Sequence, residues 1–171
     1  PRSAVNRTPA QGTSGQDGLL VYSRGSWATN VTRELQKTAT CGLKLETSTS
    51  GDNLDITIKA GSNIDLSGTY LTVYLTEDGI PESTSGAQAG ANPGYINDEV
   101  LRACLTNGTG DAMELSSGVL ATKSINGVDI SGYDKANLKV VAFIHKHDAS
   151  SPDYEVLNAQ EVHVGNTKDW D

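Results

Sequence analysis

Apolar and polar residues alternate at every second position along much of the chain after residue 42. In residues 54–59, for example, Leu54, Ile56 and Ile58 alternate with Asp, Thr and Lys. A period of two is the pattern of a β-strand that buries one face and exposes the other. The same alternation, or a short apolar run, recurs at residues 43–46, 70–79, 96–105, 119–125, 138–145 and 154–164.

One segment near the N-terminus has a helical period instead. Trp27, Val31 and Leu35 are spaced four residues apart, which places them on one face of an amphipathic helix. Ser26 is suited to cap the start of this helix and Gly42 to end it. We expect the helix to cover a sheet with its apolar stripe.

The order of these elements predicts a mainly β fold. Short strands separated by turns, without interleaved helices, favour an antiparallel β-sandwich of the immunoglobulin or fibronectin kind. Asn126-Gly127 is a strong signal for a tight turn between two strands. Residues 138–145 and 154–164 are expected to pair in antiparallel fashion around a turn at residues 148–153. Two further strands, in residues 1–7 and 18–22, are expected before the helix.

Composition and charge exclude some classes of function. The formal net charge is −8, and no Lys/Arg cluster offsets it, so a nucleic-acid partner is not expected. No apolar run is long enough for a membrane span. Since the first residue is Pro1 rather than Met, we expect a processed or cut chain, in which a missing signal peptide says nothing about export.

The two cysteines, Cys41 and Cys104, form neither a C-x-x-C pair nor a zinc pattern. Two interpretations remain open, namely one long-range disulfide or two buried thiols that act as small apolar residues. We favour the buried thiols.

No pattern typical of catalysis or of cofactor binding is present. The chain lacks G-x-S-x-G, a phosphate-binding loop and a dinucleotide fingerprint. Its acidic residues fall mostly at turns, where Asp is a common capping residue, and none has the spacing of a calcium loop. We therefore expect no enzyme activity, no catalytic residues and no cofactor.

His145 and His147 are weak candidates for a metal site. An H-x-H pair on a strand places both rings on one face, and two histidines with a third ligand can bind zinc or copper. Asp148 is adjacent and His163 lies on the expected partner strand. The charge of Lys146 between the two rings opposes a cation, so we expect no metal.

The longest polar loop, approximately residues 77–95, is the candidate for binding. Loops of this length in compact domains are either functional or mobile, and both interpretations stay open here. If the loop binds a partner, the expected contact segment is residues 78–96. The contact residues expected within it are Asp78, Glu82, Asn92 and Tyr95, with Tyr95 as an aromatic anchor.

Several segments together resemble a known family. Val73-Tyr-Leu-Thr-Glu-Asp-Gly-Ile80, Val100-Leu-Arg-Ala103, Val140-Val-Ala-Phe-Ile144 and Glu155-Val-Leu-Asn-Ala159 occur in the order found in the twenty-eight-kilodalton outer membrane protein family of Bacteroidetes. The resemblance implies an exported lipoprotein or surface protein located at the outer membrane, the cell surface or the periplasm. It also implies a thioredoxin-like domain followed by an immunoglobulin-like β domain.

The N-terminal segment is similar to the last β-β-α portion of a thioredoxin fold, with Pro1 near the position of that fold's cis-proline. The resemblance thus divides the chain into the end of a thioredoxin-like domain, residues 1–41, and a β-sandwich, residues 42–171. A C-x-x-C pair would lie upstream of Pro1, so no redox activity carries over to these residues.

Three hypotheses about function follow. The first is a non-enzymatic surface or periplasmic module that contacts a protein or a host surface, the adhesin-like role that the resemblance implies. Its membrane attachment would come only from a lipid anchor outside this chain. The second is an accessory domain of a thioredoxin-like thiol–disulfide oxidoreductase whose active site lies upstream. The third, glycan binding, requires solvent-facing tyrosines from the set Tyr70, Tyr74, Tyr95, Tyr133 and Tyr154.

Overall fold

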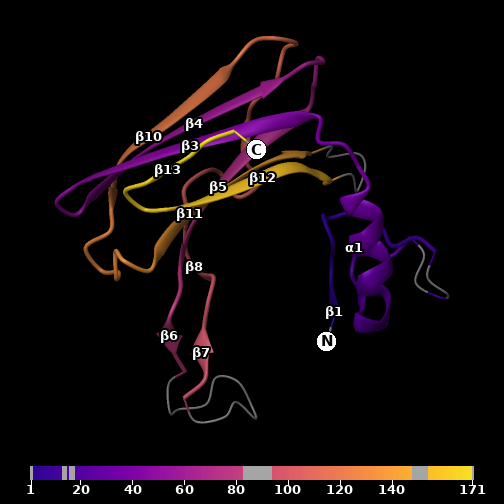
Figure 1. Cartoon of the computed structure of the whole chain (residues 1–171), viewed down its shortest axis with the longest axis horizontal. Helices are drawn as coiled ribbons and strands as arrows, with labels where there is room; N and C mark the ends of the chain where they lie inside the picture. Colours follow the sequence, from indigo (N-terminus) through magenta and orange to yellow (C-terminus); the bar gives the residue numbers. More distant parts are fainter. Residues whose placement is uncertain (1, 13–14, 16–17, 83–93, 148–153, 171) are drawn as a thin grey trace.

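The computed structural model describes residues 2–12, 15, 18–82, 94–147 and 154–170, and in these residues two antiparallel sheets pack face to face (Figure 1). The first sheet has the order β10-β4-β3-β13 and the second the order β12-β11-β5-β8, with β9 also paired to β5. The predicted antiparallel β-sandwich is confirmed. The strands of the first sheet are β3 (Cys41–Ser50), β4 (Asn53–Ser62), β10 (Ala121–Asp129) and β13 (Thr167–Lys168). Those of the second are β5 (Thr69–Glu77), β8 (Val100–Cys104), β9 (Asp111–Ala112), β11 (Leu138–Lys146) and β12 (Val156–His163).

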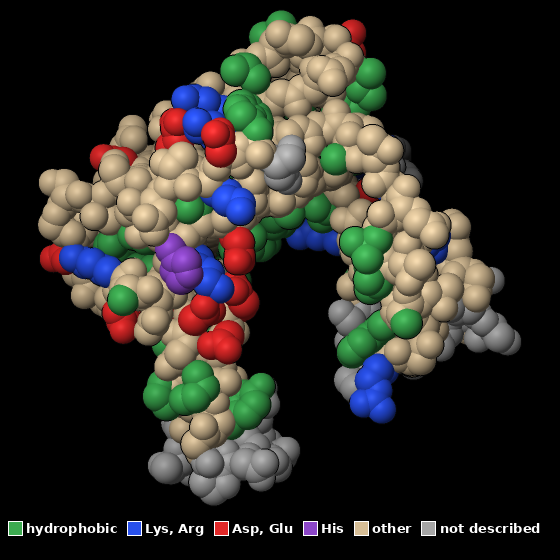
Figure 2. Space-filling view, viewed as in Figure 1, with side chains coloured by type: hydrophobic (Ala, Val, Ile, Leu, Met, Phe, Trp, Pro, Cys, Tyr) green, Lys and Arg blue, Asp and Glu red, His purple; other side chains and the backbone are tan. Residues whose placement is uncertain are grey.

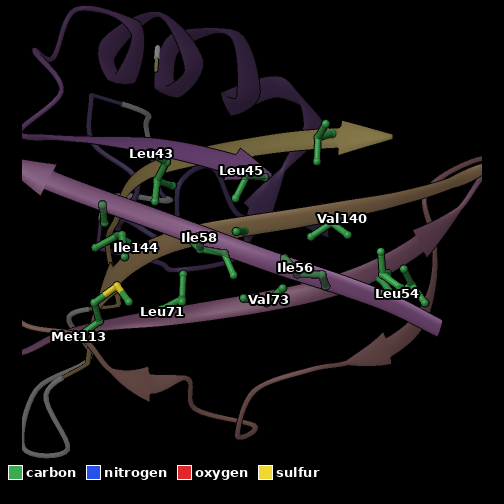
Figure 3. Close-up of a cluster of buried hydrophobic side chains, with 14 of the residues drawn as sticks. Leu43, Leu45, Leu54, Ile56, Ile58, Leu71, Val73, Met113, Val140 and Ile144 are labelled. Carbon is green, nitrogen blue, oxygen red and sulfur yellow. The ribbon is translucent and has the colours of Figure 1, made fainter. Parts of the chain in front are cut away.

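The core lies between the two sheets and is formed by the alternating aliphatic residues (Figure 3). Leu43, Ile56 and Ile58 come from the first sheet and meet Leu71 and Val73 of the second, all of them fully buried. Burying one such side chain contributes about 1.5–3 kcal/mol before conformational entropy is counted. An exposed ion pair contributes about 1 kcal/mol or less, so packing between the sheets, and not surface charge, decides the fold.

The pair β5–β11 forms the centre of the second sheet. Its register runs without a shift from Leu138 opposite Glu77 to Lys146 opposite Thr69. In contrast, the β5–β8 and β11–β12 pairings each contain a register shift. The pairing of β11 with β12 is antiparallel, as predicted from residues 138–145 and 154–164.

The predicted tight turn at Asn126-Gly127 is wrong. Both residues lie inside β10, where the register against β4 shifts between Ile125 and Val128. Gly127 has a φ of 68°, and its amide donates to Asp55 Oδ1 at 2.8 Å. This glycine therefore forms a β-bulge, because the strand continues on its far side and Asp55 on β4 provides a hydrogen-bond acceptor.

The N-terminal residues form a small unit beside the sandwich. It contains β1 (Arg2–Ser3), β2 (Tyr22–Ser23), the one-turn 3₁₀ helix η1 (Arg24–Ser26) and α1 (Trp27–Leu35). The predicted helix exists, but it ends before Gly42, which lies in β3. Ser26 occupies the N-cap position without a capping hydrogen bond from its side chain.

The expectation that α1 covers a sheet with its apolar stripe is also wrong. Val31 and Leu35 are 41% and 81% exposed, whereas Asn30 is fully buried. The Asn30 amide donates to the carbonyl of Ser26 at 2.8 Å and accepts from the amide of Gln11 at 3.2 Å. The helix thus packs on the loop before it through Asn30, and the two-stranded sheet of β1 and β2, with two residues in each strand, is too small to bury the whole stripe.

Polar contacts join this unit to β12. The ammonium of Lys37 lies 2.5 Å from a carboxylate oxygen of Glu155, and the amide of Val156 donates to the carbonyl of Asn6 at 3.2 Å. Burial raises the pKa of Glu34, but hydrogen bonds from Lys37, Asn6 and Arg33 outweigh it and lower that pKa to about 2. The division into domains at residues 41 and 42 stays a prediction.

Glu77 is a buried carboxylate at the end of β5, 4% exposed. Its Oε2 lies 2.6 Å from Arg102 Nε, and its Oε1 accepts from the amide of Asp134 at 2.9 Å. We predict that Glu77→Ala lowers the free energy of unfolding by about 1.5–3 kcal/mol, because it removes the charged hydrogen-bond acceptor of Arg102 and of the Asp134 amide. Urea unfolding measures this change.

The matched control is Glu46→Ala, which removes a more exposed carboxylate that pairs with Lys44 and Lys59. We expect a loss of about 1 kcal/mol or less from it. Equal losses in the two variants would contradict the role given to Glu77.

His145 is 2% exposed and makes two hydrogen bonds. Its Nδ1 lies 3.0 Å from the carbonyl oxygen of Lys146, which accepts only, so Nδ1 carries the proton in the neutral ring and Nε2 accepts from Thr72 Oγ1 at 2.9 Å. Burial lowers the pKa of His145 below 6.5, and the charges of Arg7 and His147 act in the same direction, against the hydrogen bond to Lys146.

The unfolded chain therefore binds a proton at this histidine more readily than the folded chain does. The stability that the neutral ring provides is fully present above about pH 6.5 and is lost as the pH falls below that value. We predict that the free energy of unfolding decreases between pH 7.5 and pH 5, and that His145→Gln reduces this dependence. The control is His163→Gln, which alters an exposed ring and should leave the pH dependence of stability intact. If His145→Gln retains the wild-type pH profile, the prediction is contradicted.

Candidate functional site

Part of the polar loop is a β-ribbon that projects from the sandwich (Figure 1). Its strands are β6 (Ile80–Pro81) and β7 (Ile96–Asn97), which pair in antiparallel fashion. Beyond them the amide of Glu82 donates to the carbonyl of Tyr95 at 2.8 Å. The Asn97 amide group donates across the ribbon to the carbonyl of Ile80 and to Glu82 Oε2. We call residues 78–82 and 94–99 the arm.

A network of charged groups holds the base of the arm on the second sheet. Asp78 Oδ1 accepts from the amide of Glu99 at 2.8 Å, and Oδ2 lies 2.6 Å from the ammonium of Lys139. Lys139, on β11, also pairs with the Glu99 carboxylate, while Asp98 accepts from the amide of Gly79 at 3.0 Å. Both strands of the arm are thus fixed where they leave the sheet.

The electrostatics of the base favour this charged state. Hydrogen bonds from Lys139 and from the Glu99 amide lower the pKa of Asp78, while hydrogen bonds to Asp78 and Glu99 raise the pKa of Lys139. Asp78 and Lys139 therefore stay ionised around neutral pH. Glu99 adopts a left-handed backbone with a φ of 55°, which is uncommon for a residue with a side chain and marks a sharp bend at this point.

Apolar side chains are exposed farther along the arm. Tyr95 and Ile96 are 47% and 46% exposed, and Leu101, just beyond the base on β8, is also exposed. Figure 2 shows apolar side chains on the projecting ribbon, separated from the sandwich by a cluster of acidic and basic side chains. Adjacent exposed apolar residues on a projection are typical of a contact surface.

The structure separates the four predicted contact residues. Asp78 lies at the base, where its carboxylate is engaged in the network, while Glu82 and Tyr95 face each other across the distal arm. Asn92 lies outside the described residues. That these residues contact a partner stays a prediction. Ile96 is the last residue of the predicted contact segment but was not among the four named residues, although an isoleucine directly after a polar loop was the available signal.

Among the described residues, the weak metal candidates meet no third ligand, and Asp148 lies outside that part of the chain. The ring of His145 is buried against Thr72, and His147 packs against Tyr70 and Tyr154 with ring centroids 5.3 and 5.4 Å apart. His163 lies on β12 but opposite Lys139, at the far end of the strand pair from His145. Within the described ranges, no three metal-ligating side chains come together.

The cysteines form no disulfide. Cys41 is buried, as expected, but the expectation that Cys104 is buried is wrong. Cys104 lies at the end of β8, an edge strand whose residues are exposed or half-buried, and its thiol donates to the carbonyl of Thr106 at 3.3 Å.

The acidic turns have structural partners. Asp52 forms an ion pair with Lys135 at 2.7 Å, and Asp55 accepts a hydrogen bond from the amide of Gly127 in the bulge.

Among the described residues, no helix is long and apolar enough to cross a membrane.

The face of several solvent-exposed tyrosines that glycan binding requires is not formed by this set. Tyr70, Tyr74, Tyr133 and Tyr154 are half-buried, and only Tyr95 of that set is classed as exposed, on the arm. Trp170, near the C-terminus, is an exposed aromatic residue that was not among the predicted site residues. Because Trp170 stands alone after the last strand, it belongs to no periodic pattern from which its exposure could be predicted.

Comparison with known proteins gives the family. The family model for outer membrane protein Omp28 matches residues 6–168. No curated protein matches the chain. Among solved structures, HBP35 of Porphyromonas gingivalis is similar at 20% identity and a TM-score of 0.70, over 88% of this chain and 49% of that one. A domain of the outer membrane lipoprotein Omp28 from Porphyromonas gingivalis is 18% identical, with a TM-score of 0.48, over 75% of this chain and 91% of that one.

The likeness to HBP35 shows a shared fold, and the chain spans about half the length of that protein. The family match covers nearly all of the sandwich and most of the N-terminal unit. The chain therefore belongs to the Omp28 family of outer membrane proteins, which places it at the bacterial outer membrane, the cell surface or the periplasm.

Proposed function

We propose that this chain is a non-enzymatic module of an exported surface protein, and that it contacts a protein or a host surface through the arm. The observation that supports this best is that the arm has both a base fixed by hydrogen bonds and ion pairs and a distal end with exposed apolar side chains. Membership of an outer membrane family supports a setting in which such contacts occur.

The base of the arm lowers the entropic cost of binding. Lys139 on β11 pairs with both Asp78 and Glu99, so the two strands of the arm leave the sheet from fixed positions. Binding to a segment that is already held in place costs less conformational entropy than binding to a disordered loop. The sandwich therefore acts as the scaffold and the arm as the contact element.

The side chains of the arm favour a partner with an apolar pocket. Tyr95 offers a large ring with a polar tip, a residue type enriched where binding energy concentrates, and Ile96 is adjacent to it. The exposed carboxylate of Asp98 at the base favours basic side chains at the rim of that pocket. Electrostatic attraction of this kind mainly raises the rate of association.

A second candidate is an accessory domain of a thiol–disulfide oxidoreductase whose thioredoxin-like site lies upstream. The exposure of Val31 and Leu35 on α1 favours it, since another part of a longer protein would cover these residues. A C-x-x-C pair in the sequence before Pro1 would support this candidate, and its absence would exclude it.

The double substitution Tyr95→Ala and Ile96→Ala tests the arm. We predict that the purified variant binds epithelial cell monolayers, or plates coated with extracellular-matrix proteins, at least tenfold more weakly than wild type, because about 1.4 kcal/mol of contact energy corresponds to a factor of ten. Surface plasmon resonance on the coated plates and fluorescence on the cells measure this.

Leu35→Ala is the matched control, since it truncates an exposed apolar residue on α1. Its binding should equal that of wild type. Wild-type protein that binds none of these surfaces, or a double variant that binds as tightly as wild type, would contradict the proposal.

A further inference from the structure

A groove of about 450 Å³ lies at one end of the first sheet, away from the arm. Its floor includes Gly42 on β3 and Gly61 on β4, which are opposite each other in the strand register. Their neighbours Cys41, Leu43 and Ala60 point into the core, so the two glycines face outward. With no side chain at either position, the sheet backbone itself forms the bottom of the groove.

Two walls of exposed apolar side chains flank this floor. Trp170, which follows β13, is 43% exposed, and Leu120, which precedes β10, is 60% exposed. Leu120 leans over the floor so closely that a Cβ atom on Gly61 would lie 2.8 Å from its Cδ2 atom. Glycine at position 61 is therefore required for this wall to lie where it does.

Both walls are held in place by hydrogen bonds and, on one side, by an ion pair. The residues before Leu120 are attached to the end of β4, since the amide of Gly118 donates to the carbonyl of Ser62 at 2.9 Å and Ser117 Oγ donates to that of Asn63 at 2.8 Å. On the other side Asp169 pairs with Lys44 at 3.2 Å, and its carbonyl accepts from Gln160. The groove is thus formed before any ligand arrives.

The chemistry of the lining is neutral. One residue in five of this chain is charged, yet none of the described residues that line the groove carries a charge. Polar groups are present in the form of Thr40, Ser62 and Asn63, next to the apolar surfaces of Trp170 and Leu120. A charged ligand would lose water here without gaining an opposite charge, which is unfavourable.

We propose that this groove binds a neutral carbohydrate, with one sugar ring stacked on Trp170. The C–H face of a sugar is apolar and slightly positive, which suits the negative face of an indole ring. Sugar hydroxyls both donate and accept hydrogen bonds, and the amide of Asn63 and the hydroxyl of Thr40 do the same. An apolar platform with a few neutral polar groups is the general form of a small-ligand site.

A peptide is the alternative ligand for a neutral groove. Gly42 and Gly61 pair with each other inside the sheet, which leaves only one side of each strand for an added peptide strand. A neutral proline-rich peptide, which binds without adding a strand, serves as the competing probe in the test.

Tryptophan fluorescence provides the readout, because the chain has two tryptophans. In a Trp27→Phe background Trp170 is the sole reporter, and we titrate it with neutral oligosaccharides of glucose, xylose, mannose and N-acetylglucosamine. At least one series should change the Trp170 emission in a saturable way. Isothermal titration calorimetry on the wild-type protein should give the same affinity as the fluorescence titration.

Substitutions locate the site. Trp170→Ala should weaken binding at least tenfold, and Trp170→Phe should retain part of it because a ring remains for stacking. Val21→Ala, at an exposed apolar residue far from the groove in sequence, should bind as wild type does. Unchanged urea unfolding of each variant shows that the fold is intact.

Three results would overturn the proposal. The first is that no neutral oligosaccharide binds. The second is that binding survives Trp170→Ala unchanged. The third is that only the proline-rich peptide alters the Trp170 emission, which would assign the groove to a protein partner.

Discussion

The pairing of β5 with β11 is the constraint on which the rest of the structure depends. These strands keep one register from Thr69 to Glu77, and that register directs Leu71, Val73 and Leu75 into the core. Every other strand of the second sheet is added to one of these two. A slip of one residue would turn the aliphatic side chains toward solvent, so the packing against the first sheet enforces the pairing. The same register brings Lys139 beside the end of β5, where it meets Asp78 and holds the arm.

The two proposed contact surfaces use the sandwich in different ways. The arm depends on the second sheet, since it continues from the ends of β5 and β8 and Lys139 on β11 pairs with Asp78 and Glu99 at its base. The groove depends on the first sheet, where two glycines that face outward remove side chains from the surface. Neither surface draws on the apolar core between the sheets. A surface protein of this family can therefore change its contacts by changing exposed side chains, while the fold retains its stability.

Strand alternation predicted most of the fold, because burial on one face imposes a period of two that is visible in residues such as Leu54, Ile56 and Ile58. The failures have particular physical causes. Gly127 was expected in a hairpin turn and forms a bulge, since the sequence does not show that Asp55 lies across from it. The stripe of Val31 and Leu35 predicted the helix correctly but not its packing, because periodicity gives a face and not its partner. The groove formed by Trp170 and the two opposed glycines was not predicted. These residues become neighbours only when β3, β4 and β13 come together. Asp78 was predicted as a contact residue but lies at the base of the arm, where it pairs with Lys139. The sequence does not show this pairing, because Lys139 is near Asp78 in space but far from it in sequence.

Native-state amide hydrogen exchange tests most directly whether the central sheet holds the arm in place. Slow exchange is expected for the amides of β5 and β11, and measurable protection for Asp78, Gly79 and Glu99, whose amides donate to Asn137, Asp98 and Asp78. Protection at these three amides should decrease when Lys139 is replaced by Met, while β5 and β11 remain protected. If the three amides of the wild-type protein exchange as fast as those of an unstructured peptide while the sheet stays protected, the sheet does not hold the arm.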